Sequence, residues 1–186
     1  MELIDRIFEG CVEEFKENGV KFTMDSLAKR IGISKRTLYE TISSKEEAVE
    51  LVVSRTFADV KQQQKEILEN EQMPTVERIK KLFTVVPTYA NVVDYRRMNE
   101  IKQSYPGIYK EIQERLENDW EPTIALLEEA MREGIIRKTN ITILKLLLCE
   151  VYERLITGEM LIKNDISYEQ AMQETITIIF EGVLSR

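Results

Sequence analysis

The chain has 186 residues, of which 43% are hydrophobic and 32% are charged, and its formal net charge is −7. This composition supplies a substantial core, and the low content of Gly and Pro beside many helix formers favours an all-α fold. The negative net charge excludes a uniformly basic coat for nucleic acid, so any such surface must be a local patch.

Several function classes are disfavoured by what the sequence lacks. It contains no histidine, which removes the commonest general base and the commonest metal ligand. It also has no Gly-rich phosphate loop and no nucleophile elbow. We therefore expect no catalytic residues, no metal site and no cofactor.

The two cysteines and the hydropathy pattern indicate where the protein works. Cys11 and Cys149 lie far apart in apolar stretches, which predicts buried free thiols and a reducing cytoplasm. No apolar stretch reaches the length of a membrane span. The expected localisation is the cytoplasm, without membrane association.

The first three predicted helices are short and closely spaced. Apolar residues at helical spacing predict a helix over 3–15, ended by Asn18-Gly19. A helix over 24–31 follows, with Thr23 as its N-cap and Gly32 at its end. Ser34 caps the third helix, over 35–41.

Six further helices are predicted after these three. Ser44 and Glu47 form a predicted capping box that opens a helix running towards Asn70. The remaining helices are expected over 74–86, 92–103, 108–133 with a kink near Pro122, 142–162 and 168–184. The prediction is an all-α protein of about nine helices, with one domain over 1–45 and a larger helical domain over 46–186.

A local reversal of charge coincides with the short helices. Between residues 21 and 45 six cations face only two acidic residues. Charge runs of this kind are commonly just solvated surfaces, so the patch alone is weak evidence. The cations are Lys21, Lys29, Arg30, Lys35, Arg36 and Lys45, and the acids are Asp25 and Glu40.

The same stretch has the pattern of a helix-turn-helix. Ala28 is small where a second helix must cross closely, and Gly32 suits a left-handed turn. Apolar residues at 27, 31, 33 and 38 fill the space between the helices, while polar residues of the third helix face outwards. A recognition helix for the DNA major groove requires this arrangement, although an ordinary αα-hairpin with a Gly turn is an alternative.

Residues 28–39, AKRIGISKRTLY, followed by 44–47, SKEE, resemble the DNA-binding region of TetR-family repressors. The resemblance is specific over about residues 3–55 and architectural beyond them. It departs from the family at Thr41-Ile42, where an aromatic pair is common, and at Arg36, where glycine is frequent. The resemblance implies phosphate contacts from Thr23, Tyr39 and Lys45, and contacts to base edges or flanking phosphates from Lys35, Arg36, Thr37 and Glu40. Ser34 belongs to the same expected DNA-binding set.

The larger domain is expected to provide a dimer interface and a ligand site. The last two predicted helices are apolar on more than one side, so each must bury more than one side. The resemblance implies a four-helix interface between two copies, whereas packing of both faces inside one chain is the alternative. The expected interface residues are Leu144, Leu148, Val151, Leu155, Met172, Ile176, Ile179 and Val183. Candidate ligand contacts are Phe57, Met98, Trp120, Leu127, Cys149 and Tyr152.

These expectations combine into a homodimeric repressor that binds a palindromic double-stranded operator and is released by a small-molecule inducer. The inducer, the operator and the regulated genes are not predictable from the residues. A helical protein-interaction module without specific DNA binding is the main alternative. An activator, or a repressor controlled by a protein partner, has the same sequence features.

Overall fold

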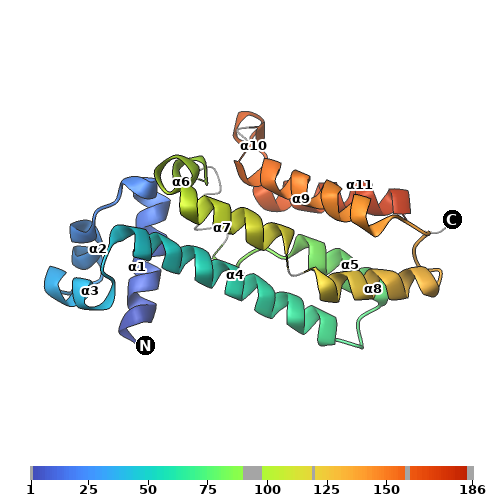
Figure 1. Cartoon of the computed structure of the whole chain (residues 1–186), viewed down its shortest axis with the longest axis horizontal. Helices are drawn as coiled ribbons and strands as arrows, with labels where there is room; N and C mark the ends of the chain where they lie inside the picture. Colours follow the sequence, from blue (N-terminus) through green and yellow to red (C-terminus); the bar gives the residue numbers. More distant parts are fainter. Residues whose placement is uncertain (1, 90–97, 119, 158–159, 184–186) are drawn as a thin grey trace. The chain divides into compact units, whose positions relative to one another are not determined.

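The computed structural model describes residues 2–89, 98–118, 120–157 and 160–183 (Figure 1). The regular elements of this part of the chain are eleven α-helices and one short 3-10 helix, which confirms the predicted all-α class. The chain divides into two compact units, the first made of residues 1–59 and 87–112 and the second of 60–86 and 113–186. The first unit extends past the domain boundary expected at residue 45, because it includes the first half of α4 and all of α6.

The elements are grouped by unit. Those that begin in the first unit are α1 Leu3–Asn18, η1 Gly19–Lys21, α2 Met24–Arg30, α3 Lys35–Thr41, α4 Lys45–Glu69, α6 Met98–Ser104 and α7 Pro106–Glu117. Those of the second unit are α5 Thr75–Thr84, α8 Glu121–Arg132, α9 Ile141–Thr157, α10 Met160–Lys163 and α11 Tyr168–Val183. Helices α4 and α7 each begin in the first unit and end in the second.

Each of the nine predicted helices has a counterpart, and two of them occur in two pieces. The helix expected over 108–133 is α7 followed by α8, because Pro122 lies in the first turn of α8, where its missing N–H costs no hydrogen bond. The helix expected over 142–162 is α9 followed by α10. Of the helix expected over 92–103, residues 92–97 lie outside the described part of the chain, and the rest is α6.

The first unit is built on α1. This helix buries Ile7, Phe8 and Cys11 and packs on α2, and Leu27 of α2 and Leu38 of α3 are fully buried. Cys11 is thus a buried free thiol as predicted, whereas Cys149 in the second unit is only half-buried. Because α2 and α3 are too short to be stable alone, this packing is what holds them.

The start of α4 corrects one detail of the prediction. The Glu47 amide donates to Ser44 Oγ at 3.1 Å, as expected for a cap. The Glu47 carboxylate, however, accepts from the amide and the hydroxyl of Ser43, both at 2.7 Å. The extended side chain reaches one residue further back than the reciprocal capping box that was expected at Ser44.

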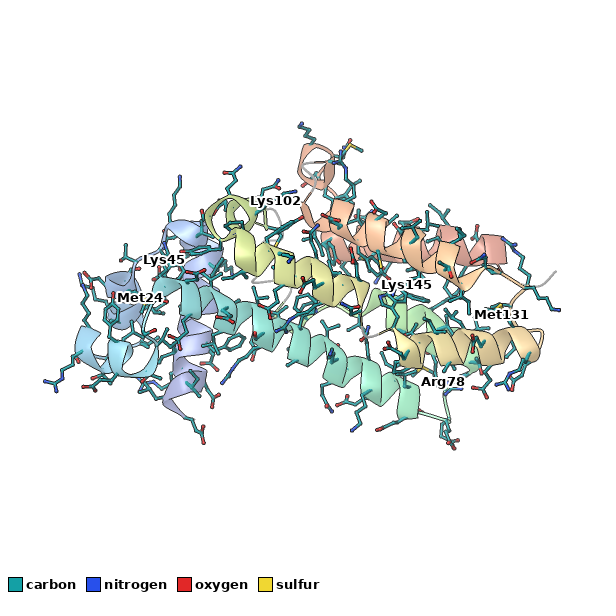
Figure 2. The ribbon with its side chains drawn as sticks, in the orientation of Figure 1. Met24, Lys45, Arg78, Lys102, Met131 and Lys145 are labelled. Atoms are coloured by element: carbon teal, nitrogen blue, oxygen red, sulfur yellow. The ribbon has the colours of Figure 1, made fainter. Side chains whose placement is uncertain are left out.

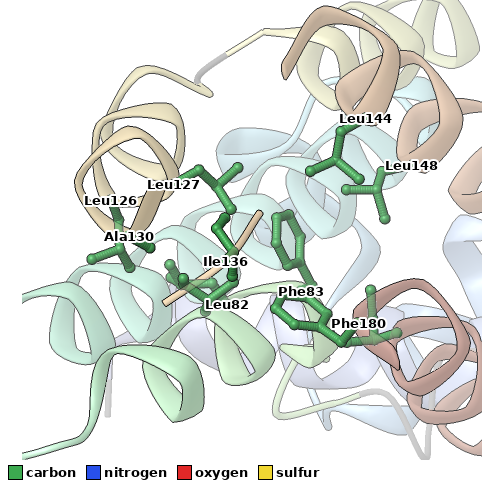
Figure 3. Packing of buried hydrophobic residues seen from close by; sticks show 11 residues of the cluster. Leu82, Phe83, Leu126, Leu127, Ala130, Ile136, Leu144, Leu148 and Phe180 are labelled. Carbon is green, nitrogen blue, oxygen red and sulfur yellow. The ribbon is translucent and has the colours of Figure 1, made fainter. Parts of the chain in front are cut away.

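The second unit has its own apolar core (Figure 3). Side chains from α5, α8, α9 and α11 meet there, together with Ile136 from the loop after α8. Its buried members are Ile79, Leu82, Phe83, Leu126, Leu127, Ala130, Ile136, Leu144, Leu148, Ile176 and Phe180. Among the described residues, no helix combines the length and apolar character needed to cross a membrane.

Candidate nucleic-acid interface

The N-terminus of α2 is fixed by a reciprocal cap. The Ser26 amide donates to Thr23 Oγ1 at 3.0 Å, and the Thr23 amide donates to Ser26 Oγ at 3.1 Å. Thr23 therefore holds the N-cap position predicted from the sequence, and it is exposed. A hydroxyl and early helix amides in this position suit a backbone phosphate, which carries the opposite charge to the helix N-terminus.

The turn between α2 and α3 depends on Gly32. Its φ of 68° lies in the left-handed region, which a residue with a Cβ adopts only with strain. The Gly32 amide donates to the Lys29 carbonyl at 3.2 Å and the Ile33 amide to the Ala28 carbonyl at 3.0 Å, which together close the end of α2. Ser34 then caps α3 by accepting from the Thr37 amide at 3.0 Å.

Helix α3 has one anchored face and one exposed face. Leu38 and, just after the helix, Ile42 are buried in the first unit. Thr37 is half-buried, and its hydroxyl lies 2.8 Å from the Ser34 hydroxyl at the start of the helix. The exposed face carries Lys35, Arg36, Tyr39 and Glu40, so α3 presents the side chains of a recognition helix.

Most cations of the basic patch already have partners within the chain. Lys35 Nζ lies 2.7 Å from Asp25 Oδ1, and this hydrogen bond raises the pKa of Lys35. Arg36 Nε lies 3.0 Å from Glu40 Oε1 one turn along α3. Arg30 is paired with acidic residues of α1 on the inner side of α2. Within the described residues, Lys21 and Lys29 are the two of these six cations that form no ion pair or hydrogen bond through their ammonium groups.

Lys45, labelled in Figure 2, is the first residue of α4. It is half-buried at the start of α4, where its ammonium donates to the Val20 carbonyl and lies 5.0 Å from the centre of the Phe22 ring. Burial lowers the pKa of this lysine. Lys45 therefore ties η1 to α4, and its ammonium keeps further N–H donors beyond the one that bonds the Val20 carbonyl.

Sequence reasoning missed the buried support behind the interface. The Glu14 carboxylate is buried and accepts from Arg30 Nε at 2.8 Å, Ser26 Oγ at 2.9 Å and Asn18 Nδ2 at 3.0 Å. Arg6 of the same helix donates to the Ile31 carbonyl at the end of α2. These contacts fix both ends of α2 on α1. The sequence shows no sign of this role, because Glu14 and Arg6 are two of several charged residues along α1.

The candidate ligand contacts fall in both units. Phe57 and Met98 are half-buried in the first unit. In the second unit the other four gather around α7 and the end of α5, since Trp120 Nε1 donates to the Leu116 carbonyl at 2.9 Å and the Tyr152 hydroxyl donates to the Phe83 carbonyl at 3.0 Å. Cys149 donates to the same Leu116 carbonyl at 3.5 Å, and Leu127 is part of the buried core.

The residues expected at the dimer interface differ in exposure. Leu144, Leu148, Met172 and Ile176 are buried inside the chain itself and leave little side-chain surface for a second copy. Val151, Leu155 and Ile179 are half-buried, and the side chain of Val183 lies outside the described part. The face of α9 and α11 that stays exposed consists instead of Ile143, Leu146, Leu147 and Ile178. Because both helices are apolar on two sides, the spacing alone did not decide which side packs inward.

Comparison with known proteins agrees with this architecture. The family model described as bacterial regulatory proteins, tetR family, matches residues 7–52. An uncharacterized helix-turn-helix transcriptional regulator of Bacillus subtilis, YvaF, is 27% identical over 178 residues, which are 96% of this chain and 94% of that protein.

Two solved structures share the fold over nearly the whole chain. The fatty acid degradation regulator FadR from Bacillus halodurans has a TM-score of 0.72 at 16% identity and covers 98% of this chain and 97% of its own. The transcriptional regulator FadR from Bacillus subtilis, in complex with stearoyl-CoA, has a TM-score of 0.63 at 15% identity. The match covers 96% of this chain and 98% of that protein. The capped helices, the Gly32 turn, the exposed face of α3 and these matches lead to one assignment: the chain is a DNA-binding transcriptional regulator and belongs to the TetR family, whose members are not enzymes.

Proposed function

We propose that the protein is a homodimeric repressor that binds a palindromic DNA operator and is released from it by a small molecule that carries a long apolar chain. The observation that carries the proposal is the exposed face of α3, with Lys35, Arg36, Tyr39 and Glu40 held outwards by the buried Leu38. One such helix makes few base contacts. Two of them, about 34–36 Å apart on a dimer, reach successive major grooves and read both halves of a palindrome.

The exposed apolar face of α9 and α11 supports the dimer. Ile143, Leu146 and Leu147 recur at helical spacing on α9 and are 60%, 57% and 48% exposed, and Ile178 on α11 is 69% exposed. Helices α9 and α11 pack on each other, and both present these apolar side chains to solvent. Contiguous apolar surface of this kind commonly marks an association site, and a second copy of the same face is its proposed partner.

The proposed ligand is a molecule with a long apolar chain, and an acyl-CoA is the first class to test. Support comes from the FadR of Bacillus subtilis, which holds stearoyl-CoA and shares this fold. Trp120, Leu127, Cys149 and Tyr152 offer apolar surface with two polar tips, which is the usual composition of a ligand site. Burial raises the pKa of Tyr152 well above its ordinary value, and its hydroxyl donates to the Phe83 carbonyl.

Release of DNA by such a ligand requires a difference in affinity. A ligand that binds the DNA-bound and DNA-free conformations equally well cannot shift the equilibrium between them. The acyl-CoA must therefore bind the DNA-free conformation more tightly, and DNA must in turn weaken acyl-CoA binding by the same factor. The cytoplasm, which contains both DNA and acyl-CoA, is the proposed place of action.

The test begins with selection of binding sites from a random duplex pool by the purified protein. A palindromic site is expected, and Tyr39→Ala should weaken binding to all sequences while Arg36→Ala relaxes preference at one base pair. Stearoyl-CoA is then titrated against the protein–operator complex, with free CoA as the matched control. Release by stearoyl-CoA alone supports the ligand class.

The alternatives give different results in the same experiment. Enrichment of no sequence, with weak binding that disappears at moderate salt, favours a protein-interaction module instead of an operator-binding protein. A clear palindrome that no acyl-CoA displaces leaves repression by DNA binding in place and rejects the proposed ligand class.

A further inference from the structure

The recognition helix α3 carries an internal cation–carboxylate pair on its outer face. Arg36 Nε donates to Glu40 Oε1 at 3.0 Å, and the two residues are one helical turn apart. Their side chains are 88% and 61% exposed, so water surrounds the pair in the free protein. Exposed pairs of this type contribute little to folding, because solvent screens the charges. Stability therefore does not explain why both residues lie on this face.

The ion pair leaves the two terminal amino groups of the Arg36 guanidinium available. An arginine carries five N–H donors in a planar fork. The bond to Glu40 uses the donor at Nε, and within the described residues the two terminal amino groups of Arg36 make no hydrogen bond. Two parallel donors at that end match the O6 and N7 acceptors that guanine presents in the major groove.

The carboxylate needs a separate explanation, because Glu40 adds a negative charge to the exposed face of α3 that is proposed to meet polyanionic DNA. A negative charge there weakens binding to every sequence through repulsion. It can compensate by holding Arg36 in one orientation, because a flexible side chain that is already ordered loses less entropy when it binds. Its remaining oxygen can accept from water or from a neighbouring base without releasing Arg36.

The second pair on this surface provides a comparison. Lys35 Nζ contacts Asp25 of α2 and lies 6.0 Å from the centre of the Tyr39 ring. An ammonium is a compact point charge without the planar fork, so it suits phosphates and does not read a base edge bidentately. Of the two pairs, only Arg36–Glu40 has the geometry for base recognition.

We propose that Glu40 is a positioning residue that orients Arg36, so that the Arg36 terminal amino groups select a guanine at one fixed position of each operator half-site. The inference rests on the proposed recognition of a specific operator. It assigns Glu40 an indirect role in specificity, different from the direct contact with bases or phosphates implied by the family resemblance.

The experiment compares full-length wild type with Glu40→Ala, Arg36→Ala and the double variant on the selected operator. Affinity is measured by fluorescence anisotropy on duplexes that carry each of the four base pairs at the position where Arg36→Ala loses preference. The wild type should prefer guanine there by about 5- to 150-fold. Glu40→Ala should lose a large part of that preference at the same position although Arg36 is present, and the double variant should discriminate no less than Arg36→Ala.

Two further variants separate positioning from other effects. Glu40→Gln keeps an acceptor oxygen without the charge and should retain more of the guanine preference than Glu40→Ala. Asp25→Ala removes the carboxylate of the other pair and should change affinity for all four duplexes alike. Each variant must have the same melting temperature as the wild type, because a misfolded α3 would also lose the guanine preference.

Other outcomes contradict the inference. If Glu40→Ala alters preference at a different base pair, additively with Arg36→Ala, Glu40 reads a base of its own. If it raises affinity for all four duplexes equally, the carboxylate only repels DNA. In both cases the operator itself is still bound, whereas a wild type that enriches no sequence rejects the proposed function together with this inference.

Discussion

The Glu14 carboxylate, only 2% exposed, accepts a hydrogen bond from Arg30 Nε at 2.8 Å and so joins the middle of α1 to the last turn of α2. The same carboxylate accepts from Ser26, which caps α2 at its other end. One buried charge thus fixes the position of α2 along its whole length. Since α3 is held on α2 through the Gly32 turn, Glu14 also sets where the recognition helix lies.

Replacement of Glu14 by Gln should destabilise the protein by about 3 kcal/mol. The substitution removes one partner of a buried ion pair and leaves the Arg30 guanidinium facing a neutral amide, while a second acidic residue, Glu17, still compensates part of its charge. Urea denaturation at pH 7 measures the loss. Glu9→Gln on the exposed side of α1 is the matched control and should change the free energy of unfolding by less than about 0.5 kcal/mol. Equal effects of the two substitutions would contradict the structural role of Glu14.

The same group predicts a dependence of stability on pH. Burial alone would raise the pKa of Glu14, but hydrogen bonds from Arg30, Ser26 and Asn18 outweigh it and lower the pKa below the ordinary 4.5. A carboxyl whose pKa is lower in the folded state contributes stability above its unfolded pKa, and this contribution is lost as pH falls through the folded pKa. The free energy of unfolding should therefore decrease as the pH is lowered from about 4.5.

Asp5 and Glu47 contribute to the same fall in stability. The pKa of Asp5 is lowered by its hydrogen bond from Arg55, and that of Glu47 by its bonds from Ser43. Urea denaturation of wild type and Glu14→Gln from pH 7 to pH 3 separates the contributions. The variant should show the shallower decline, because only the exposed carboxyls then titrate; parallel curves would mean that Glu14 has the same pKa in both states.

Gly10 marks the closest approach of α1 to α2. A Cβ at this position would lie 2.4 Å from Cγ2 of Ile31 and 3.0 Å from Cδ1 of Leu27. Ile31 is β-branched and cannot turn Cγ2 away freely, so Gly10→Ala should destabilise by about 1–3 kcal/mol, although Ala is the better helix former. Thermal unfolding of Gly10→Ala tests this, with Gly182→Ala as control.

The control and a rescue variant make the result specific. Gly182 lies in α11 with no atom within 4 Å of its would-be Cβ, so its replacement by Ala should be neutral or slightly stabilising. Ile31→Ala removes the Cγ2 atom that causes the clash. Gly10→Ala should then cost less in the Ile31→Ala background than in the wild type, and an unchanged cost would mean that Ile31 is not the obstacle.

Local features of the helix-turn-helix were predictable from the sequence, because each depends on residues only a few positions apart. Thr23 and Ser34 cap the helices that follow them, and Gly32 takes the left-handed conformation expected at the turn. The buried role of Glu14 and the contact at Gly10 depend on which side of α1 meets α2, and the sequence of α1 does not reveal this. Both involve residues more than ten positions apart.

The apolar helices of the second unit illustrate a different limit. In α9, Leu147 and Leu148 are neighbours of the same type, yet Leu148 is fully buried and Leu147 is half exposed. Hydrophobicity could not distinguish them, because the helix is apolar on both sides. Leu148 belongs to the same buried core as Phe83 and Phe180, which come from two other helices, so the packing of distant segments decides which leucine faces inward.

Cys11 should be inert to thiol reagents in the folded protein. Burial, with a smaller contribution from the nearby Glu14 charge, raises the pKa of its thiol to about 12, so almost no thiolate exists at pH 8. In a Cys149→Ala background, labelling of Cys11 by a maleimide should proceed only as fast as the protein unfolds, and urea should accelerate it strongly. The half-buried Cys149, tested alone in a Cys11→Ala background, should react faster; rapid native-state labelling of Cys11 would contradict its burial.

The exposed face of α9 and α11 predicts which substitutions separate the proposed dimer. Leu146→Glu and Ile178→Glu each place a charge in a surface that a second copy is expected to cover, so both should give folded monomers with unchanged helix content. Analytical ultracentrifugation measures the mass, against 21.8 kDa for one chain. Gln173→Glu, exposed on another side of α11, adds the same charge and should remain dimeric.

Loss of the dimer should also change DNA binding in a specific way. A monomer retains its α3, so its affinity for a single half-site should match that of the wild type. Its affinity for the full palindrome should fall to that half-site level, because the second recognition helix no longer binds as part of the same molecule. If Leu146→Glu and Ile178→Glu remain dimeric, another surface joins the copies, and the exposed leucines and isoleucines of α9 and α11 must be covered by something other than a second copy.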